Sequence, residues 1–256
     1  MKGNVQASGK ADPLWPADDI ITPPEEGKVR VWGCSLATDL HQSGISPDSL
    51  SSEELQRASR FHRDELRARF ISSRVLLRSV LGRCLNIAPS AVNIGLEDRG
   101  KPHLNHHTQI QFNLAHSGDL MLLAVTNGMK IGVDVERVRP LNDAKAIARR
   151  FFSTNESNWL QRCSDQELDQ AFFQLWTRKE AVLKATGEGI SSGLDSLELL
   201  NPEGTFKPAV TRTADGGSET RWTFHDLHPA AGYIGALALP KMDGEVQIKC
   251  AWFQVD

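Results

Sequence analysis

Two successive runs of this chain have the same order of predicted elements: a strand, a helical stretch and then several strands. In the first run, the alternation over residues 29–32 predicts a strand. Apolar residues at steps of three and four from Ser51 then predict a helical stretch to about residue 85, either one helix or two helices broken near residues 62–64. The strands expected after it cover residues 92–96, 111–114 and 120–126.

The second run begins with a strand over residues 130–138. A helical segment near residues 143–152 and a longer helix over 165–186 follow, and glycines end the longer helix. The last strands are expected at residues 197–200, 221–224, 233–239 and 246–253. The shared order predicts an α+β protein of two similar halves. We expect a flexible leader over 1–28, an N-terminal half over 29–128 and a C-terminal half over 129–256.

The composition is that of a globular chain, and it argues against several functional classes. Of 256 residues, 40% are hydrophobic and 24% charged, and the net charge of −3 disfavours a broadly basic nucleic-acid-binding protein. The longest apolar run, Leu120 to Val125, is far shorter than the roughly 20 residues of a membrane-spanning helix. The N-terminus has no apolar signal segment, and the widely spaced cysteines predict free thiols. We therefore expect a cytoplasmic protein that binds neither nucleic acid nor membranes.

The strand over residues 130–138 carries two carboxylates on one face. Its period of two places Val133 and Val135 on one side, and Asp134 and Glu136 on the other. Like charges this close raise each other's proton affinity unless they share a cation. Carboxylate oxygens suit Mg²⁺, which usually also binds substrate phosphates. The alternative interpretation is a solvated strand face.

A second candidate set lies on the helix predicted over residues 165–186. Trp176, Glu180 and Lys184 are four residues apart and form one stripe, with Lys179 beside it. Glu180 and Lys184 could be an ordinary surface ion pair, worth only about a few tenths of a kcal/mol. Trp176 on the same stripe indicates partial burial, where an isolated ion pair is unexpected.

Two turns offer groups that can bind phosphate. His116 and Ser117, before Gly118, provide an imidazole, a hydroxyl and backbone donors at the end of a strand. Gly100 and Lys101 lie in a turn where glycine permits close approach of the backbone to a ligand. Each turn alone has an ordinary structural explanation.

Taken in order, these segments resemble the Sfp-type 4′-phosphopantetheinyl transferase family. The family pattern is matched by GKP at 100–102, FNLAHS at 112–117, GVDVE at 132–136 and WTRKEAVLK at 176–184. The segment from Arg150 to Glu156 is similar to a helix-end segment of the family. The resemblance covers about residues 50–190, and the ordered set is more specific than any single motif. One departure is Ala115, where the family often has serine; it affects one hydroxyl contact to the coenzyme A phosphates that the resemblance implies, and not the reaction.

The resemblance implies transfer of 4′-phosphopantetheine from coenzyme A to a serine of an apo acyl or peptidyl carrier protein, with release of adenosine 3′,5′-bisphosphate. It implies a monomer with coenzyme A in the cleft between two similar α+β halves. Asp134, Glu136 and Glu180 then hold Mg²⁺, or Mn²⁺ in its place, and Glu180 helps to deprotonate the serine. The resemblance also implies that Lys184, supported by Lys179, neutralises charge on the leaving phosphate and that His116 contacts a coenzyme A phosphate. Gly100 and Lys101 would receive the adenosine 3′-phosphate end. Arg57 and Arg78 would provide cations near the nucleotide.

Two other functions are open at this point. A Mg²⁺-dependent phosphohydrolase or nuclease would use the same carboxylates with Lys184. A catalytically inactive module that binds coenzyme A or a carrier would not need the complete set of charged residues. The many arginines between residues 51 and 85 are most simply a solvated basic face, although they also suit an acidic carrier.

Overall fold

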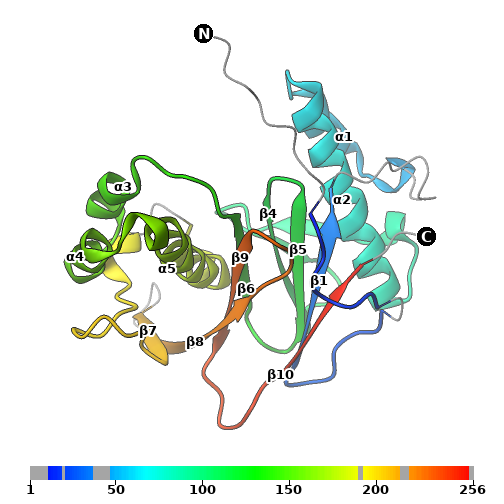
Figure 1. Ribbon diagram of the computed structural model, residues 1–256. Helices are drawn as coiled ribbons and strands as arrows, with labels where there is room; N and C mark the ends of the chain where they lie inside the picture. The colour runs from blue at the N-terminus through cyan, green and yellow to red at the C-terminus, as the bar shows by residue number, and fades with distance from the viewer. Residues whose placement is uncertain (1–10, 19–20, 37–46, 190–192, 214–218, 254–256) are drawn as a thin grey trace.

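A computed structural model describes residues 11–18, 21–36, 47–189, 193–213 and 219–253. It contains two four-stranded sheets, with the strand orders β10–β1–β5–β4 and β6–β9–β8–β7 (Figure 1). The first sheet consists of β1 (Lys28–Ser35), β4 (Ile110–Ser117), β5 (Leu120–Asn127) and β10 (Gln247–Trp252). The second consists of β6 (Gly132–Arg137), β7 (Ala209–Thr213), β8 (Glu219–Leu227) and β9 (Tyr233–Pro240). A short antiparallel pair is formed by β2 (Ile94–Leu96) and β3 (Pro102–Leu104).

Helices cover the outer faces of the two sheets, and the inner faces of the sheets meet (Figure 1). Helix α2 (Asp64–Leu85) shares a hydrophobic core with the first sheet, and helix α5 (Asp165–Thr186) shares one with the second. A third core joins the sheets, with Val31 and Leu122 from the first and Val133 and Leu237 from the second. Each half is thus a sheet with a long helix on it, which confirms the α+β class.

The helical stretch after Ser51 consists of two helices. Ser51 begins α1 (Ser52–Ser59) with a capping box, in which its hydroxyl accepts from the Glu54 N–H at 3.2 Å and the Glu54 carboxylate accepts from the Ser51 N–H at 3.0 Å. Helix α2 starts at Asp64, so of the two alternatives left open the structure has two helices, with the break near residues 62–64. It ends at Asn86, whose φ of 55° is left-handed.

The structure corrects one predicted strand and adds elements. Residues 197–200 form no strand of a sheet, because they follow the 3-10 turn η4 (Leu194–Ser196) and only Leu200 makes an isolated bridge, to Phe206. Their leucines are buried in the core beneath α5, so the apolar run reflects burial rather than strand pairing. Among the strands and α-helices of the described ranges, three were not predicted: β3, β7 and α4 (Thr154–Arg162), which lies between α3 (Ala144–Phe151) and α5.

Segments near both ends of the described chain pair with the opposite half. Strand β10, which a boundary at residue 129 assigns to the C-terminal half, pairs in parallel with β1 of the first sheet. Within the expected leader, Pro13 bridges Ala230 and Ala17 bridges Trp252, so residues 11–18 lie against the rest of the protein. The local pattern of a strand does not show which partner it will pair with. No helix in the described ranges is long and apolar enough to cross a membrane.

Candidate functional site

Three elements meet where the halves adjoin: the end of β4, strand β6 and helix α5. The N–H of Val133 in β6 donates to Asn113 Oδ1 of β4 at 2.8 Å. Gly132 lies so close to α5 that an added Cβ would be 1.8 Å from the carbonyl oxygen of Ala181. Only glycine fits at this position, and the missing side chain allows α5 to lie directly over the carboxylate face of β6.

Asp134 and Lys184 form an ion pair between β6 and α5. Lys184 Nζ is 2.6 Å from Asp134 Oδ1, and Asp134 is 5% exposed. Burial, with a smaller contribution from Glu136, raises the pKa of Asp134 to about 6 against the lowering effect of the Lys184 ammonium. The carboxylate face of β6 is therefore not a solvated strand face, and Lys184 pairs with Asp134 rather than with Glu180.

Glu180 projects from α5 close to the same carboxylates. It is 5% exposed, and among the described residues its Oε1 has no hydrogen-bond partner. Burial, followed by the charge of Asp134, raises the pKa of Glu180 to about 7. A carboxylate with this pKa can take up a proton at neutral pH.

Glu136 connects this group to the end of β4. Its Oε2 accepts a hydrogen bond from Ser117 Oγ at 2.7 Å, and the Arg139 guanidinium is 3.7 Å away. Ser117 Oγ in turn accepts from the N–H of Arg137 at 3.1 Å. The histidine-serine turn is thereby held beside the carboxylates of β6.

The donor set fits a hard divalent cation such as Mg²⁺. Two buried oxygens, Asp134 Oδ2 and Glu180 Oε1, lack a hydrogen-bond partner within the described ranges, and a bound cation would satisfy them. The three carboxylates do not converge on a single point: in the part of the chain that the structure describes, no three His, Cys, Asp or Glu side chains are placed to hold a metal ion as they stand. Instead, the Lys184 ammonium occupies Asp134 Oδ1.

A cavity of about 300 Å³ adjoins this group, between the helices α1 and α2 and the turn after β4. His116 and Ser117 line it from β4, and Arg57 lines it from α1. The structure therefore brings together two residues expected to bind coenzyme A, His116 and Arg57. Loss of hydration lowers the pKa of His116, and the charge of Lys184 lowers it further.

Gly100 and Lys101 lie in the turn between β2 and β3, beside the end of α5. Gly100 has a φ of 83°, and nothing lies within 4 Å of an added Cβ, so glycine is favoured here by backbone conformation. Lys101 Nζ donates to the carbonyl oxygen of Ala185 at 3.0 Å, where the helix dipole favours a cation. Burial lowers the pKa of Lys101 to about 8. A second cavity of about 300 Å³ lies between this turn and β4.

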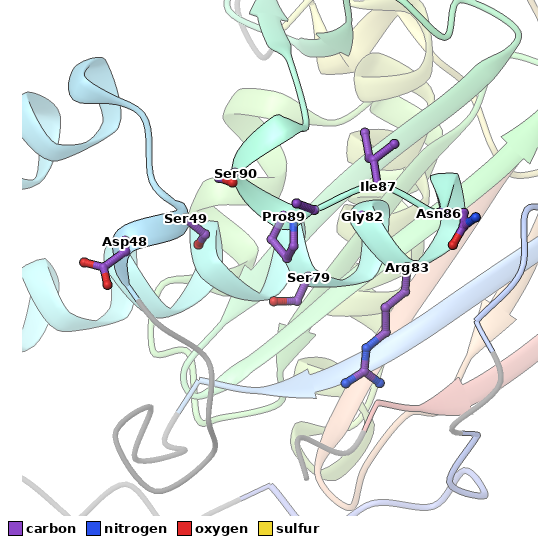
Figure 2. Close-up of a pocket in the computed structure, with 10 residues that line it drawn as sticks. Asp48, Ser49, Ser79, Gly82, Arg83, Asn86, Ile87, Pro89 and Ser90 are labelled. Atoms are coloured by element: carbon purple, nitrogen blue, oxygen red, sulfur yellow. The ribbon is translucent and has the colours of Figure 1, made fainter.

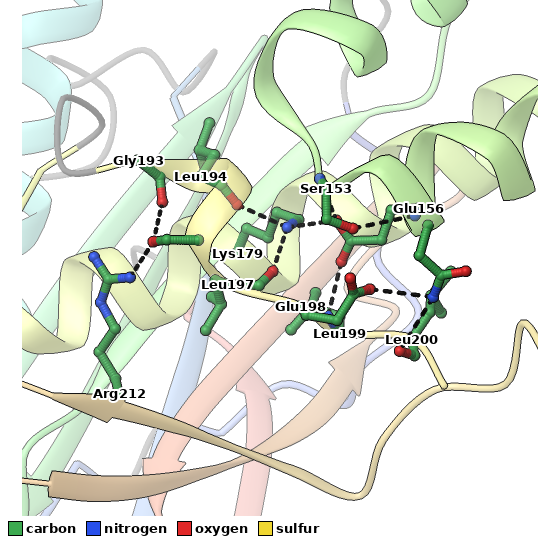
Figure 3. Close-up of polar contacts among 12 residues, drawn as sticks. Ser153, Glu156, Lys179, Gly193, Leu194, Leu197, Glu198, Leu199, Leu200 and Arg212 are labelled. Carbon is green, nitrogen blue, oxygen red and sulfur yellow. Dashed lines mark hydrogen bonds and ion pairs between the residues drawn. The ribbon is translucent and has the colours of Figure 1, made fainter. Parts of the chain in front are cut away.

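Lys179 is placed in the core of the C-terminal half, which corrects its expected support of catalysis (Figure 3). Its Nζ is 2.6 Å from Glu156 of α4, and it donates to the carbonyl oxygens of Leu194, at 2.8 Å, and Leu197. Both charged side chains are fully buried, and the three donors of the ammonium are engaged. Since successive helix positions differ by about 100°, Lys179 turns away from the face of Glu180.

Arg78 is also a structural residue, which corrects its expected contact with the nucleotide. Its Nε is 2.7 Å from Glu54, and it donates to the carbonyl oxygens of Pro89 and Val92 at 3.2 and 2.8 Å. These bonds tie α2 to α1 and to the 3-10 turn η2 (Pro89–Ala91). A cavity of about 740 Å³ lies beside η2 and the end of α2, and none of the expected site residues lines it (Figure 2).

Two contributors were not expected as site residues. Gly132 provides the close contact of β6 with α5, and a glycine inside a strand pattern is a signal that could have indicated such an approach. Arg74 of α2 lines the cavity beside His116. Nothing in the sequence distinguishes it from the other arginines of that helix.

Comparisons with known proteins agree with this arrangement. Residues 41–128 match a family model described as 4′-phosphopantetheinyl transferase, N-terminal, and residues 130–238 match the 4′-phosphopantetheinyl transferase superfamily. The chain is 38% identical to the 4′-phosphopantetheinyl transferase HetI of a Nostoc species over 216 residues, 83% of this chain and 87% of the relative. It is 33% identical to Sfp of Bacillus subtilis over 151 residues, 59% of this chain and 66% of the relative. A mouse L-aminoadipate-semialdehyde dehydrogenase-phosphopantetheinyl transferase is 26% identical over 253 residues, 90% of this chain and 81% of the relative.

Proposed function

The chain belongs to the 4′-phosphopantetheinyl transferase family, and we propose that the site formed by β4, β6 and α5 carries the family's reaction. The protein transfers phosphopantetheine from coenzyme A to carrier proteins. The comparisons support neither a phosphohydrolase or nuclease nor an inactive binding module. The observation that carries the assignment to this site is the gathering of Asp134, Glu180 and Lys184 by β6 and α5.

The reaction places two demands on the side chains of the site. The serine oxygen bonds to the phosphorus that carries pantetheine, while the bond from that phosphorus to the bridging oxygen breaks and its electron pair leaves with adenosine 3′,5′-bisphosphate. Glu180 accepts the serine proton through one of its carboxylate oxygens, and its place beside the charges of Asp134 and Lys184 supports this role. Lys184, whose side chain is 30% exposed, neutralises charge that develops on the leaving phosphate.

Asp134, Glu136 and Glu180 are the residues that would hold Mg²⁺ or Mn²⁺. When bound there, the cation supplies charge neutralisation for the pyrophosphate. The unpartnered oxygens of Asp134 and Glu180 support this assignment. The two oxygens of Glu180 allow one carboxylate to act both as a ligand and as a base.

The remaining roles concern coenzyme A and the state of the protein. His116 and Arg57, in one cavity beside the carboxylates, bind coenzyme A through its phosphates. Gly100 and Lys101 stay a predicted contact for the adenosine end, next to the second cavity. A monomeric state, the absence of nucleic-acid binding and a cytoplasmic location also stay predictions.

The proposed reaction is tested by incubating the protein with coenzyme A, Mg²⁺ and an apo carrier protein. Mass spectrometry should show that the carrier gains one phosphopantetheine group, and a carrier with its acceptor serine changed to alanine should gain none. Release of adenosine 3′,5′-bisphosphate without a carrier would favour the phosphohydrolase. Coenzyme A binding without any modification of the carrier would indicate the inactive module.

A further inference from the structure

A strap formed by residues 11–18 connects the two sheets. The N–H of Ala231, in the loop between β8 and β9 of the second sheet, donates to the carbonyl oxygen of Asp12 at 3.1 Å. Further along the strap, the carbonyl oxygen of Pro16 accepts from the N–H of Trp252 in β10 of the first sheet, at 2.7 Å. The strap therefore fixes the loop between β8 and β9 relative to the first sheet.

The loop held by the strap leads into Tyr233, the first residue of β9 and the only tyrosine of the chain. The N–H of Tyr233 donates to the carbonyl oxygen of Ala230 at 3.1 Å, and the N–H of Val138 donates to that of Gly232 at 2.9 Å. Tyr233 also pairs with Arg137 of β6, and it is 6% exposed. Its backbone is thus held by the strapped loop on one side and by the carboxylate-bearing strand on the other.

The hydroxyl of Tyr233 lies against the turn between β4 and β5. An added Cβ on Gly118 would be 3.0 Å from the Tyr233 hydroxyl oxygen. Burial raises the pKa of Tyr233, whereas the charge of Arg137 and a hydrogen bond from the backbone of Asp119 lower it. The Asp119 carboxylate is itself 2.9 Å from Arg69 of α2. A buried hydroxyl of the C-terminal half is therefore hydrogen-bonded to a turn of the N-terminal half.

This turn begins directly after Ser117, which orients one of the site carboxylates. Ser117 Oγ donates to Glu136 Oε2 at 2.7 Å and accepts from the N–H of Arg137 at 3.1 Å. The competing partner of Glu136 Oε2 is the Arg139 guanidinium, 3.7 Å away. Because Ser117 precedes Gly118, a shift of the turn displaces its hydroxyl and leaves Glu136 free to rotate towards Arg139.

We propose that Tyr233 is a positioning residue for phosphopantetheinyl transfer: anchored by the strap, its hydroxyl fixes the turn at Gly118 and, through Ser117, the direction of Glu136. The inference rests on the proposed function, in which Glu136 helps to hold Mg²⁺. Groups that orient a metal-binding side chain from behind strengthen metal binding without contacting the metal. Tyr233 acts in this way through the turn and not on the substrate.

The test is a Mg²⁺ titration of the Tyr233→Phe variant, which keeps the buried ring and loses only the hydroxyl. The half-point is the Mg²⁺ concentration at which half of the rise in Tm is reached without coenzyme A. Tyr233→Phe should raise it roughly 3- to 10-fold, less than the roughly 10- to 100-fold typical of a group bonded directly to a metal ligand, as in Ser117→Ala. Carrier modification should need correspondingly more Mg²⁺, and saturating Mg²⁺ should restore kcat to within about twofold of the wild type.

Two controls separate this role from general stability. Thr223→Val removes a hydroxyl of β8 opposite Leu239, towards the other end of β9, and should leave the half-point unchanged. In the strap, Trp15→Ala removes a side chain packed on the core between the sheets and should raise the half-point as Tyr233→Phe does. Leu14→Ala, at a side chain that is 60% exposed, should not.

A spectroscopic measurement tests the same link in the unsubstituted chain. Because the chain has one tyrosine, protein that contains 3-fluorotyrosine gives a single ¹⁹F resonance. Mg²⁺ should move this resonance in the otherwise wild-type protein, since the hydroxyl contacts the turn that orients Glu136. The same Mg²⁺ concentration should leave the resonance in place in Ser117→Ala, which breaks the connection.

An unchanged half-point in Tyr233→Phe would overturn the inference, as would a loss of kcat that saturating Mg²⁺ does not relieve. A ¹⁹F resonance that ignores Mg²⁺, or an unchanged half-point in Trp15→Ala, would also contradict it. Each of these results leaves phosphopantetheinyl transfer by the wild-type protein intact. Failure of the proposed function is distinguishable, because the wild-type protein would then modify no carrier at any Mg²⁺ concentration.

Discussion

At the scale of single residues, Lys184 has one candidate partner in the sequence and a different partner in space. The spacing on the helix offers Glu180 four residues before it, whereas the structure pairs it with Asp134 at 2.6 Å. The ammonium is therefore held between a metal-ligand candidate and the solvent, where a phosphate can approach it. This placement separates the roles of Lys184 and Glu180, which a surface ion pair would leave equivalent.

Lys184→Ala should lower kcat by roughly 10²- to 10³-fold, the range for loss of one electrostatic stabiliser of the transition state. The Kd of coenzyme A should change much less, because the interaction strengthens mainly as charge develops on the leaving phosphate. Steady-state kinetics and calorimetry measure the two quantities. Lys241→Ala, at an exposed lysine, is the control, and an unchanged kcat in Lys184→Ala would remove the assigned role.

Asp134→Asn should abolish the rise in Tm that Mg²⁺ causes in the absence of coenzyme A. Ligands that bind only the folded state raise its stability, so Mg²⁺ should raise the Tm of the wild-type protein without coenzyme A. The variant keeps the size of the side chain but loses the charge that a hard cation needs. Thermal melts with and without MgCl₂ measure the effect. Asp243→Asn, at an exposed carboxylate, should respond as the wild type does, and a full response of Asp134→Asn would refute the ligand assignment.

At the scale of elements, the site depends on how closely helix α5 approaches strand β6. The backbone of Ala181 occupies the space that a side chain at position 132 would need. A second fixed contact holds the other side of α5, where Lys179 bonds to Glu156 of α4 and to the turn η4. The helix is thus positioned from two directions, and each contact gives a prediction.

Gly132→Ala should destabilise the protein by about 1–3 kcal/mol and lower kcat even in the folded fraction. The added methyl group would meet a backbone oxygen, so α5 has to shift and carries Glu180 and Lys184 with it. Chemical denaturation and activity assays measure both effects. Adding Ala185→Gly should not rescue the variant, because the nearest atom belongs to the backbone of Ala181; rescue by this change would show that the contact is misassigned.

Lys179→Met should lower the free energy of unfolding by about 3–5 kcal/mol, because it leaves the fully buried Glu156 carboxylate without its cation. The double variant with Glu156→Gln should recover part of this loss. Denaturant titration of the single and double variants measures the coupling. If Lys179→Met instead melted like the wild type and lost turnover, the catalytic role that the sequence predicts for Lys179 would be restored.

At the scale of the whole molecule, the first sheet contains strands from both ends of the sequence. No single cut of the chain therefore separates the two halves. Strand β10 lies beside β1 in the first sheet, although its neighbours in sequence belong to the second. Phe253, directly after β10, is buried in the core of the first sheet with α2. The site between the halves therefore depends on a strand that no site motif contains.

Deletion of residues 245–256 should unfold both halves together, because it exposes the edge of β1 and removes the buried Ala251, Trp252 and Phe253. Circular dichroism and calorimetry should show one cooperative transition in the full chain and its loss in the truncated one. Lys249→Ala, which removes only a half-exposed ion pair with Asp18, should change stability by less than about 1 kcal/mol. A truncated chain with the wild-type Tm would show that the halves fold independently.

Much of the protein was determined locally by its sequence. Alternation along residues 130–138 placed Asp134 and Glu136 on one face, and helical spacing placed Glu180 and Lys184 on one stripe, as the structure describes. The start of the helical pattern at Ser51 and the glycine after α5 marked helix ends correctly. These features depend on residues a few positions apart, whose relative directions are set by the backbone of a single element.

Only the tertiary structure decided which of these side chains face the site. Lys179 and Arg78 carry charges suited to phosphate, yet both are bound inside the protein, by Glu156 and Glu54. The pairing of β10 with β1 and the burial of the apolar residues 197–200 without a strand were likewise invisible to local patterns. The physical reason is that a helix or strand has a fixed internal geometry but a free orientation, which is chosen by contacts between residues distant in sequence.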